Sequence, residues 1–241
     1  MSIPTYDYIV IGGGSGGIAS ANRAAMRGAK VLLIEAQHLG GTCVNVGCVP
    51  KKVMWQASHV IEAVEKEAAG YGIYAHVDKF DFAKLVENRE KYIEFLHGAY
   101  QRGLDSNKVE VIHGYAHFVD NHVISVDNQQ FYGENILIAT GARPMSLAIP
   151  GGEYAKNSDD FFALTELPKH VLILGAGYIA AELAGVMHGL GSQVTWAYRK
   201  ARPLRQFDTQ IIESLVNLYQ ARGITTKANH VPAKIEKTAS G

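Results

Sequence analysis

Hydrophobic and polar residues alternate along the chain in patterns typical of a protein that mixes helices and strands. The short apolar runs at residues 7–11 and 30–34 have the length and composition of buried parallel strands. Residues 18–26, which lie between them, carry small residues at helical spacing. This pattern predicts a strand–helix–strand unit at the start of the chain.

Two longer stretches follow, with apolar residues at steps of three and four. They predict helices at residues 53–69 and 80–104, the second broken or ended near Gly98 and Gly103. Apolar runs separated by Asp–Asn turns then predict a small antiparallel meander of three strands, at residues 109–112, 117–119 and 123–126. Residues 135–141 predict a further buried strand that ends in a turn of small residues, where a cofactor could approach closely.

The second half of the chain repeats the first pattern. Residues 143–168 are rich in proline and glycine and form the best candidate linker. Beyond it we expect helices at residues 181–190 and 208–222, the latter capped by Asp208, and strands at 171–174, 193–198, 224–230 and 233–237. We therefore predict an α/β fold with two Rossmann-like units and two domains, residues 1–143 and 144–241. The second domain is expected to be incomplete.

The first strand runs directly into a glycine-rich turn that fits a dinucleotide. Gly12, Gly14 and Gly17 have the spacing GxGxxG, within the segment that also contains Ser15 and Gly16. Such glycines allow a tight turn, let the backbone approach a pyrophosphate, and let helix and strand pack closely. Glu35 ends the second strand, where a carboxylate can accept hydrogen bonds from ribose hydroxyls. The alternative is a glycine-rich turn without a ligand.

A second turn of the same kind follows the linker. Gly175, Gly177 and Ala180 form the variant GxGxxA after the strand at 171–174. The next strand ends in basic residues instead of an acid, namely Arg199, Lys200, Arg202 and Arg205. Cations at this position favour a 2′-phosphate, so the site should prefer NADP over NAD. A solvated basic loop is the alternative.

Composition and charge exclude several other functions. The chain has 23 basic and 23 acidic residues and 47% hydrophobic residues, which is ordinary for a globular protein. There is no basic patch for nucleic acid, no apolar run long enough to span a membrane, and no signal peptide pattern at the N-terminus. We expect a reducing, cytoplasmic location. His113, His117 and His122 are interpreted as surface residues of strands, so no metal site is predicted.

The only two cysteines of the chain, Cys43 and Cys48, are separated by four residues. A disulfide between them would close a very short loop and contribute little stability. Near the start of a helix, thiols are expected to have lowered pKa values. We interpret the pair as a dithiol that cycles with a disulfide. Two unrelated buried cysteines are the alternative.

The cysteine segment, residues 41–52 with the sequence GTCVNVGCVPKK, resembles the pyridine nucleotide–disulfide oxidoreductases throughout. The resemblance extends over the whole chain, and residues 13–55 are especially similar to the glutathione reductases of that family. It implies that the first unit binds FAD and the second NADPH. It also implies that electrons pass from NADPH through FAD and the Cys43–Cys48 disulfide to glutathione disulfide, which maintains reduced glutathione.

The resemblance also assigns roles to individual residues. Cys48 is similar to the thiol that lies against the flavin, Cys43 to the thiol that attacks glutathione disulfide, and Lys51 to a buried cation near the flavin that pairs with Glu182. Tyr178 resembles an aromatic lid over the flavin. FAD contacts are implied for Ser15, Gly16, Glu35, Thr42, Cys43, Lys51 and Ala116. Thr140 and Gly141, at the end of the strand expected at 135–141, are further predicted cofactor residues. NADPH contacts are implied for Ala176, Ile179, Glu182, Arg199 and Arg205, and glutathione contacts for Ser15, Arg23 and Tyr100.

Related substrates fit less well. Trypanothione reductases carry an acidic and an aromatic residue on the first helix, where this chain has Ala19, Asn22 and Arg23. Val44 and Arg199 differ from lipoamide dehydrogenases, and mercuric reductases need additional cysteines. The family's C-terminal interface domain, through which the full-length protein forms a homodimer, is expected to be absent, so we predict that the chain is inactive alone. A reductase of another small disulfide or of a thioredoxin-type substrate, or a non-catalytic flavin-binding fragment, remains an alternative.

Overall fold

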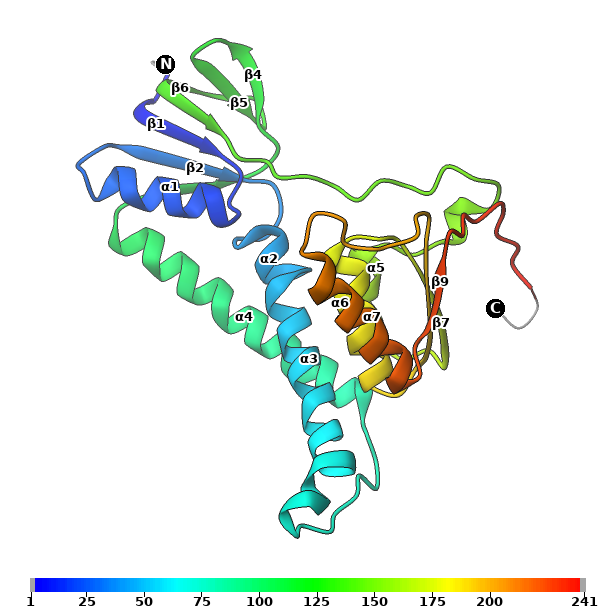
Figure 1. Ribbon diagram of the computed structural model, residues 1–241. Helices are drawn as coiled ribbons and strands as arrows, with labels where there is room; N and C mark the ends of the chain where they lie inside the picture. The colour runs from blue at the N-terminus through cyan, green and yellow to red at the C-terminus, as the bar shows by residue number, and fades with distance from the viewer. Residues whose placement is uncertain (1–2, 239–241) are drawn as a thin grey trace. The chain divides into compact units, whose positions relative to one another are not determined.

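The computed structural model of the chain describes residues 3–238, so the outermost residues of the predicted domains lie outside the described part. The chain forms two compact units (Figure 1). Unit 1 comprises Met1–Pro50 and Glu90–Arg143, and unit 2 comprises Lys51–Arg89 and Pro144–Gly241. Residues 51–89 thus group with the second half of the chain. The functional domain bounds 1–143 and 144–241 stay a prediction.

Unit 1 is built on a six-stranded mixed sheet with the order β3-β2-β1-β6-β5-β4. Its parallel part joins β3, β2, β1 and β6, while β6, β5 and β4 pair antiparallel. The strands are β1 (Thr5–Ile11), β2 (Val31–Glu35), β3 (Glu110–His113), β4 (His117–Asp120), β5 (Val123–Val126) and β6 (Gln129–Ile138). The predicted α/β class and the strand–helix–strand start of the chain are confirmed.

Alternation along the strands sends buried side chains to both faces of this sheet. On one face, Ile9 and Leu32 pack with Ile124 and Phe131 of the antiparallel strands. The other face is covered by α1 (Ser15–Ala25) and the C-terminal part of α4 (Phe82–Ser106). The buried cluster there contains Val10, Leu33, Ile18, Ala21 and Leu104. Because both faces are covered, β1 and β2 are apolar at every position from Tyr8 to Ile11 and from Val31 to Ile34, as the sequence suggested.

Three expectations for unit 1 are wrong. Helix α4 runs unbroken through Gly98 and Gly103, because a helical glycine costs only about 1 kcal/mol and the packing of the helix offsets it. The strand expected at 109–112 is β3, which pairs in parallel with β2 and does not join the meander; β4, β5 and β6 form that meander instead. The end of β6 is not buried, since Ile138 is 63% exposed.

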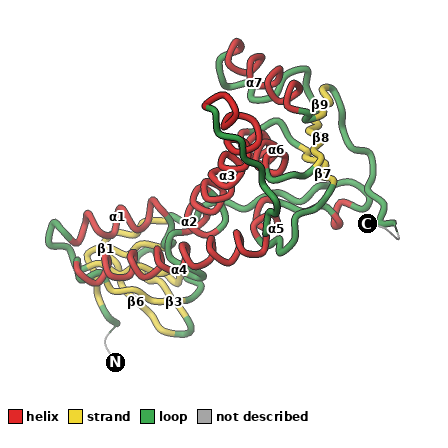
Figure 2. Tube along the Cα trace, turned by 90° about the horizontal axis from the view of Figure 1, so that it is seen from below, coloured by secondary structure: helices red, strands yellow, loops and turns green. Residues whose placement is uncertain are grey.

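Unit 2 contains a three-stranded parallel sheet with helices packed on it (Figure 2). The strands β7 (His170–Leu174), β8 (Gln193–Tyr198) and β9 (Thr225–Ala228) lie in that order. Helix α6 (Tyr178–Gly189) packs on β7 and β8, and α7 (Thr209–Arg222) packs on β9. The Asp208 side chain accepts hydrogen bonds from the amides of Gln210 and Ile211, so the predicted cap of α7 is confirmed.

The remaining helices also differ from expectation. The helix predicted at 53–69 begins at Cys48 as α3 (Cys48–Glu62), then continues as a π-helical turn, η1 (Ala63–Glu67), and a 3-10 turn, η2 (Ala68–Tyr71). The linker contains η3 (Gly152–Tyr154) and α5 (Ser158–Phe162). Residues 233–237 form no strand, because the Ile235 amide donates to the Pro150 carbonyl instead of to a sheet.

A buried arginine in unit 2 was not anticipated. Arg89 is 2% exposed, and its guanidinium donates to the Phe162 carbonyl at 2.7 Å and contacts the Met54 sulfur at 3.4 Å. One side chain therefore links α3, α5 and the N-terminal part of α4. Nothing in the sequence distinguishes Arg89 from surface arginines, because its environment is formed by residues far apart in the chain.

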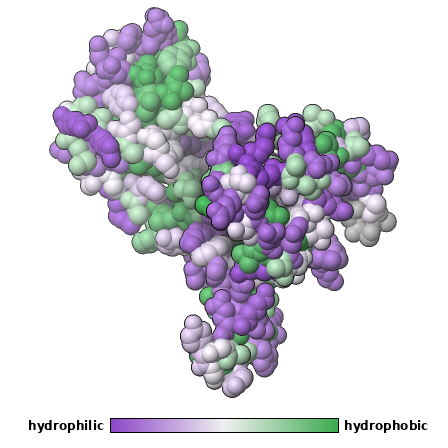
Figure 3. Space-filling model, in the orientation of Figure 1, coloured by the Kyte–Doolittle hydropathy of each residue, from purple (hydrophilic) through white to green (hydrophobic). Residues whose placement is uncertain are grey.

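The surface mixes residue types. Figure 3 shows hydrophilic and hydrophobic residues interspersed on the face in view, in keeping with the balanced composition. Among residues 3–238, no helix is both long enough and apolar enough to cross a membrane.

Candidate functional site

The first glycine-rich turn has the geometry of a dinucleotide cradle. Gly12 has φ +109°, and a Cβ placed on it would overlap the Ala139 carbonyl at the end of β6. A Cβ on Gly17 would overlap the Gly12 carbonyl, whereas Gly16 has open space around it. Gly12 and Gly17 therefore leave no room for a side chain, because the backbone of another residue packs directly on the backbone at each position. The free amides of the first turn of α1 are left to face a ligand, as at other helix N-termini.

Glu35 is held in place beside this turn. Its Oε2 accepts from the Gly13 amide at 2.5 Å, and its Oε1 accepts from the Gln37 amide at 2.7 Å. Each carboxylate oxygen keeps capacity for another hydrogen bond, which suits ribose hydroxyls. The turn and Glu35 therefore fit the adenosine diphosphate part of a dinucleotide such as FAD.

The cysteine segment lies directly against the glycine-rich turn. The Gly40 amide donates to the Gly13 carbonyl at 2.8 Å, and Gly40 bridges to Gly14 as in a parallel sheet. A Cβ on Gly41, which has φ +56°, would lie 2.7 Å from the Gly14 Cα. Only glycines allow this approach. It places the short helix α2 (Gly41–Asn45), which carries Cys43, beside the predicted FAD site.

The structure brings the two cysteines together as free thiols. Cys43 is partly buried in α2, and Cys48 is exposed as the first residue of α3. Burial raises the pKa of the Cys43 thiol, and the adjacent Cys48 sulfur raises it further. Hydrogen bonds from the Cys48 backbone and from the Ser15 hydroxyl lower the pKa by smaller amounts. For Cys43, the expectation of a lowered pKa is wrong, because burial of the thiol and the neighbouring Cys48 sulfur outweigh the hydrogen bonds that favour a thiolate.

Ser15 is expected to tune the reactivity of Cys43. In Ser15→Ala, the Cys43 thiolate loses a hydrogen-bond donor, so the pKa of Cys43 should rise further. At a pH below that pKa the thiolate fraction falls, and alkylation by iodoacetamide should slow by about two- to tenfold. Peptide mass spectrometry of alkylated Cys43 over a pH series measures this. Unchanged alkylation profiles in Ser15→Ala and the wild type would contradict it.

Asn45, which lies between the cysteines, was not singled out from the sequence. Its side-chain amide donates to the carbonyls of Gly41, at 2.9 Å, and Leu39, at 3.2 Å. Its Oδ1 lies 2.6 Å from Nε2 of His97 on α4, and His97 stacks on His38 with ring centroids 5.4 Å apart. Asn45 thus holds the conformation of the cysteine segment. The only sequence signal for Asn45 was its position inside the cysteine segment. The sequence contained no signal for His97.

The second glycine-rich turn is preserved in unit 2. Gly175 has φ +141° and its amide donates to the Ala197 carbonyl at 3.0 Å, while Gly177 caps α6 with open space around it. The Ala176 carbonyl accepts from Leu204 at 2.7 Å. Tyr178 and Ile179 are exposed at the start of α6. The sequence did not reveal that buried Trp196 donates from Nε1 to the Gly175 carbonyl at 2.7 Å and so fixes the turn.

The basic residues after β8 are not equivalent. Arg199, Lys200 and Arg205 are exposed, as a site for a 2′-phosphate requires. Arg202 is partly buried, and its guanidinium donates to the Thr209 hydroxyl at the start of α7. It therefore supports the structure, while Arg199 and Arg205 remain the candidate phosphate ligands. The turn and these cations fit NADPH.

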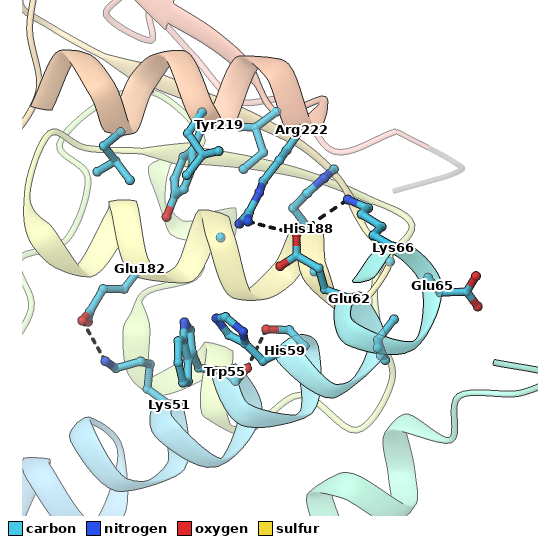
Figure 4. Close-up of a pocket in the computed structure, with 18 of the residues that line it drawn as sticks. Lys51, Trp55, His59, Glu62, Glu65, Lys66, Glu182, His188, Tyr219 and Arg222 are labelled. Carbon is cyan, nitrogen blue, oxygen red and sulfur yellow. Dashed lines mark hydrogen bonds and ion pairs between the residues drawn. The ribbon is translucent and has the colours of Figure 1, made fainter. Parts of the chain in front are cut away.

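The predicted ion pair between Lys51 and Glu182 is present. Lys51 Nζ on α3 lies 2.7 Å from Glu182 Oε1 on α6 (Figure 4). The Lys51 side chain is 22% exposed and that of Glu182 43% exposed, so the cation is partly accessible and not buried. An exposed pair of this kind contributes little to stability, which favours a role in orienting the lysine.

The remaining candidates are dispersed over unit 1. Thr140 and Gly141 follow β6 beside Gly12, Thr42 is exposed on α2, and Ala116 packs on the core between β3 and β4. Of the predicted glutathione ligands, Ser15 adjoins Cys43, whereas Arg23 lies about 12 Å further along α1 and Tyr100 packs against the core. Within residues 3–238, His113, His117 and His122 belong to no cluster able to hold a metal.

Comparison with known proteins agrees with this geometry. Residues 6–240 match the family described as pyridine nucleotide-disulphide oxidoreductase. The chain is 46% identical over 254 aligned residues to a glutathione reductase of Yarrowia lipolytica, covering 100% of the chain and 54% of that protein. It is 43% identical over 245 residues to a glutathione reductase of Schizosaccharomyces pombe, covering 98% of the chain and 53% of that protein. The chain thus spans about half the length of the curated relatives it matches.

Proposed function

Because the chain belongs to the pyridine nucleotide-disulphide oxidoreductase family, we propose that it is part of an NADPH-dependent reductase of glutathione disulfide. The observation that carries the proposal is the pair of thiols in α2 and at the start of α3, held against a dinucleotide cradle. Two relatives are named glutathione reductases, and these names suggest glutathione disulfide as the substrate. The role would be to keep glutathione reduced.

The residues of the two turns would hold the cofactors. Gly12, Gly14, Gly17 and Glu35 would bind FAD, together with Ser15, Gly16, Thr42, Cys43, Lys51, Ala116, Thr140 and Gly141. Gly175, Gly177 and Arg199 would bind NADPH, together with Ala176, Tyr178, Ile179, Glu182 and Arg205. When bound, NADPH and FAD supply the two electrons that reduce the Cys43–Cys48 disulfide to two thiols.

The two thiols would then perform disulfide exchange. The Cys43 thiolate attacks one sulfur of glutathione disulfide, which forms a mixed disulfide and releases one glutathione thiolate. The Cys48 thiolate attacks the Cys43 sulfur, releases the second glutathione, and closes the Cys43–Cys48 disulfide. Burial and the Cys48 sulfur raise the pKa of Cys43, and the hydrogen bond from the Ser15 hydroxyl, which lowers that pKa, would favour the attacking thiolate.

Lys51 and Glu182 would act together in electrostatic stabilisation. The Glu182 carboxylate orients the Lys51 ammonium through the 2.7 Å ion pair, so the cation is fixed before charge develops near it. Tyr178, exposed at the start of α6, would cover the flavin and move when nicotinamide enters. Arg23 and Tyr100 would contribute to the glutathione site.

An anaerobic titration of the purified chain with NADPH tests the proposal. Bound FAD and a growing long-wavelength thiolate-to-flavin absorbance band are expected, followed by its loss when glutathione disulfide is added. Trypanothione disulfide, lipoamide and oxidised thioredoxin serve as comparison substrates. FAD binding without the band would instead support a non-catalytic flavin-binding protein.

The basic residues after β8 should determine the choice of nicotinamide cofactor. Changing Arg199 and Arg205 together to glutamine removes two exposed cations that would contact a 2′-phosphate. The Kd for NADPH should rise by about ten- to a hundredfold, and that for NADH should stay within about twofold. Isothermal titration calorimetry measures both, with Lys227→Gln and Lys237→Gln combined as a control that removes the same number of exposed cations. Equal weakening for the two nucleotides would contradict the assignment.

A further inference from the structure

Unit 2 contains a cavity of about 620 Å³, and most of the residues that line it have no role in the proposed reductase chemistry (Figure 4). Helices α3, α6 and α7 surround it, and the Lys51–Glu182 pair lies at one end. Its volume is within the range of ordinary small-molecule sites. Neither the second glycine-rich turn nor Arg199 and Arg205 line it, so it is separate from the predicted NADPH phosphate site.

Aromatic and aliphatic side chains form much of the cavity wall. Trp55 and His59 on α3 lie with ring centroids 3.9 Å apart. Tyr219 on α7 faces α6 and donates to the Ala181 carbonyl at 3.0 Å. Leu215 and Leu218 add apolar surface from α7. A planar, largely apolar molecule would find complementary surface here.

The whole lining of the cavity carries one more cation than carboxylates, with Lys51, Lys52, Lys66 and Arg222 against Glu62, Glu65 and Glu182. The Glu62 carboxylate, 17% exposed, is shared by Arg222 at 3.0 Å and Lys66 at 3.8 Å. The nearby Glu65 carboxylate is engaged by the Val77 amide. Arg222 and Lys66 therefore share the Glu62 carboxylate, and the guanidinium of Arg222 still has donors for a second anion.

Two further features of the wall are unusual for a purely structural helix bundle. Glu65 and Lys66 lie on η1, and π-helical turns frequently mark functional sites. Nδ1 of His188 on α6 is buried without a hydrogen-bond partner, although buried polar groups are generally paired. A small shift of the imidazole would let a ligand satisfy this atom.

From these observations we propose that the cavity is a binding site for a small aromatic anion, a planar ring system carrying a carboxylate or sulfonate. The anionic group binds Arg222 and Lys66, and the rings pack against Trp55, Tyr219 and Leu218. The site does not depend on the proposed reductase activity, because none of these five residues has a role in that activity.

The probe for the test is 8-anilinonaphthalene-1-sulfonate, an aromatic sulfonate, titrated into the full chain by calorimetry. We expect one saturable site per chain, with the same Kd in the presence of saturating NADPH. Arg222→Gln removes the anion ligand and should weaken binding at least about tenfold. Leu218→Glu places a negative charge on the exposed apolar wall and should weaken it similarly.

Matched controls separate this site from general dye binding. Arg27→Gln removes an exposed cation after α1, and Leu218→Met keeps an apolar side chain, so both should bind the probe as the wild type does. Circular dichroism verifies that each variant is folded. If Leu218→Glu does not fold, the comparison of Arg222→Gln with the wild type decides the test. Absence of saturable binding, competition by NADPH, or equal affinity in wild type and Arg222→Gln would overturn the proposal.

Discussion

In the full-length reductase of which we propose this chain to be part, replacement of either cysteine by serine is expected to lower NADPH-dependent disulfide reduction by at least about a thousandfold, because each thiol performs one of two sequential exchange steps. The two variants should nevertheless differ. Cys48→Ser should accumulate a stable mixed disulfide between Cys43 and glutathione, since the second thiol that would release it is gone. Mass spectrometry of the reduced, FAD-loaded protein after exposure to glutathione disulfide measures the adduct.

Cys43→Ser provides the control for the order of attack. If Cys43 is the attacking thiol, this variant should form the glutathione adduct far more slowly than Cys48→Ser. The comparison is informative because Cys48 is the more exposed thiol and the pKa of Cys43 is raised. An adduct that forms faster on Cys48 would reverse the two roles but keep the dithiol chemistry. Turnover by both single variants would eliminate that chemistry.

Gly17→Ala is expected to lower the free energy of unfolding by about 2–4 kcal/mol and to abolish FAD binding. The added Cβ would overlap the Gly12 carbonyl and lie 3.2 Å from the Val10 side chain, so α1 would have to move away from β1. That movement would open the cradle formed by the glycine-rich turn. Urea denaturation followed by circular dichroism measures the stability, and flavin fluorescence measures the binding.

The neighbouring Gly16 offers a matched control on the same helix. A Cβ there meets nothing within 4 Å, and alanine is the better helix former, so Gly16→Ala should be neutral or stabilising by up to about 1 kcal/mol. Equal losses of stability in Gly16→Ala and Gly17→Ala would indicate that the close packing of α1 on the turn is not what requires glycine.

Local sequence patterns predicted the elements whose causes are local. The two glycine-rich turns, the strands beside them and the Asp208 cap occur as expected, because neighbouring residues determine them. The Lys51–Glu182 pair was predicted as well, but from the family resemblance and not from a pattern, since 131 positions separate its partners.

The expectations that were wrong depended on distant contacts. Gly98 and Gly103 were expected to interrupt a helix, yet packing of α4 on the core outweighs their weak helix propensity. Residues 109–112 were assigned to a meander, but the strand there, β3, pairs with β2, and this pairing is set by the register of the whole sheet. The pKa of Cys43 depends on its burial, which no local pattern reports.

The sequence by itself determined the residue types of the candidate sites: one glycine-rich turn in each half of the chain, and one pair of cysteines separated by four residues. Those features need only residue type and short spacing. The tertiary structure decided how they are positioned: Asn45 held by His97, the cysteine segment pressed on Gly14, and the cavity between α3, α6 and α7. Each of these requires residues far apart in sequence to meet, and their meeting is determined by packing of the whole unit.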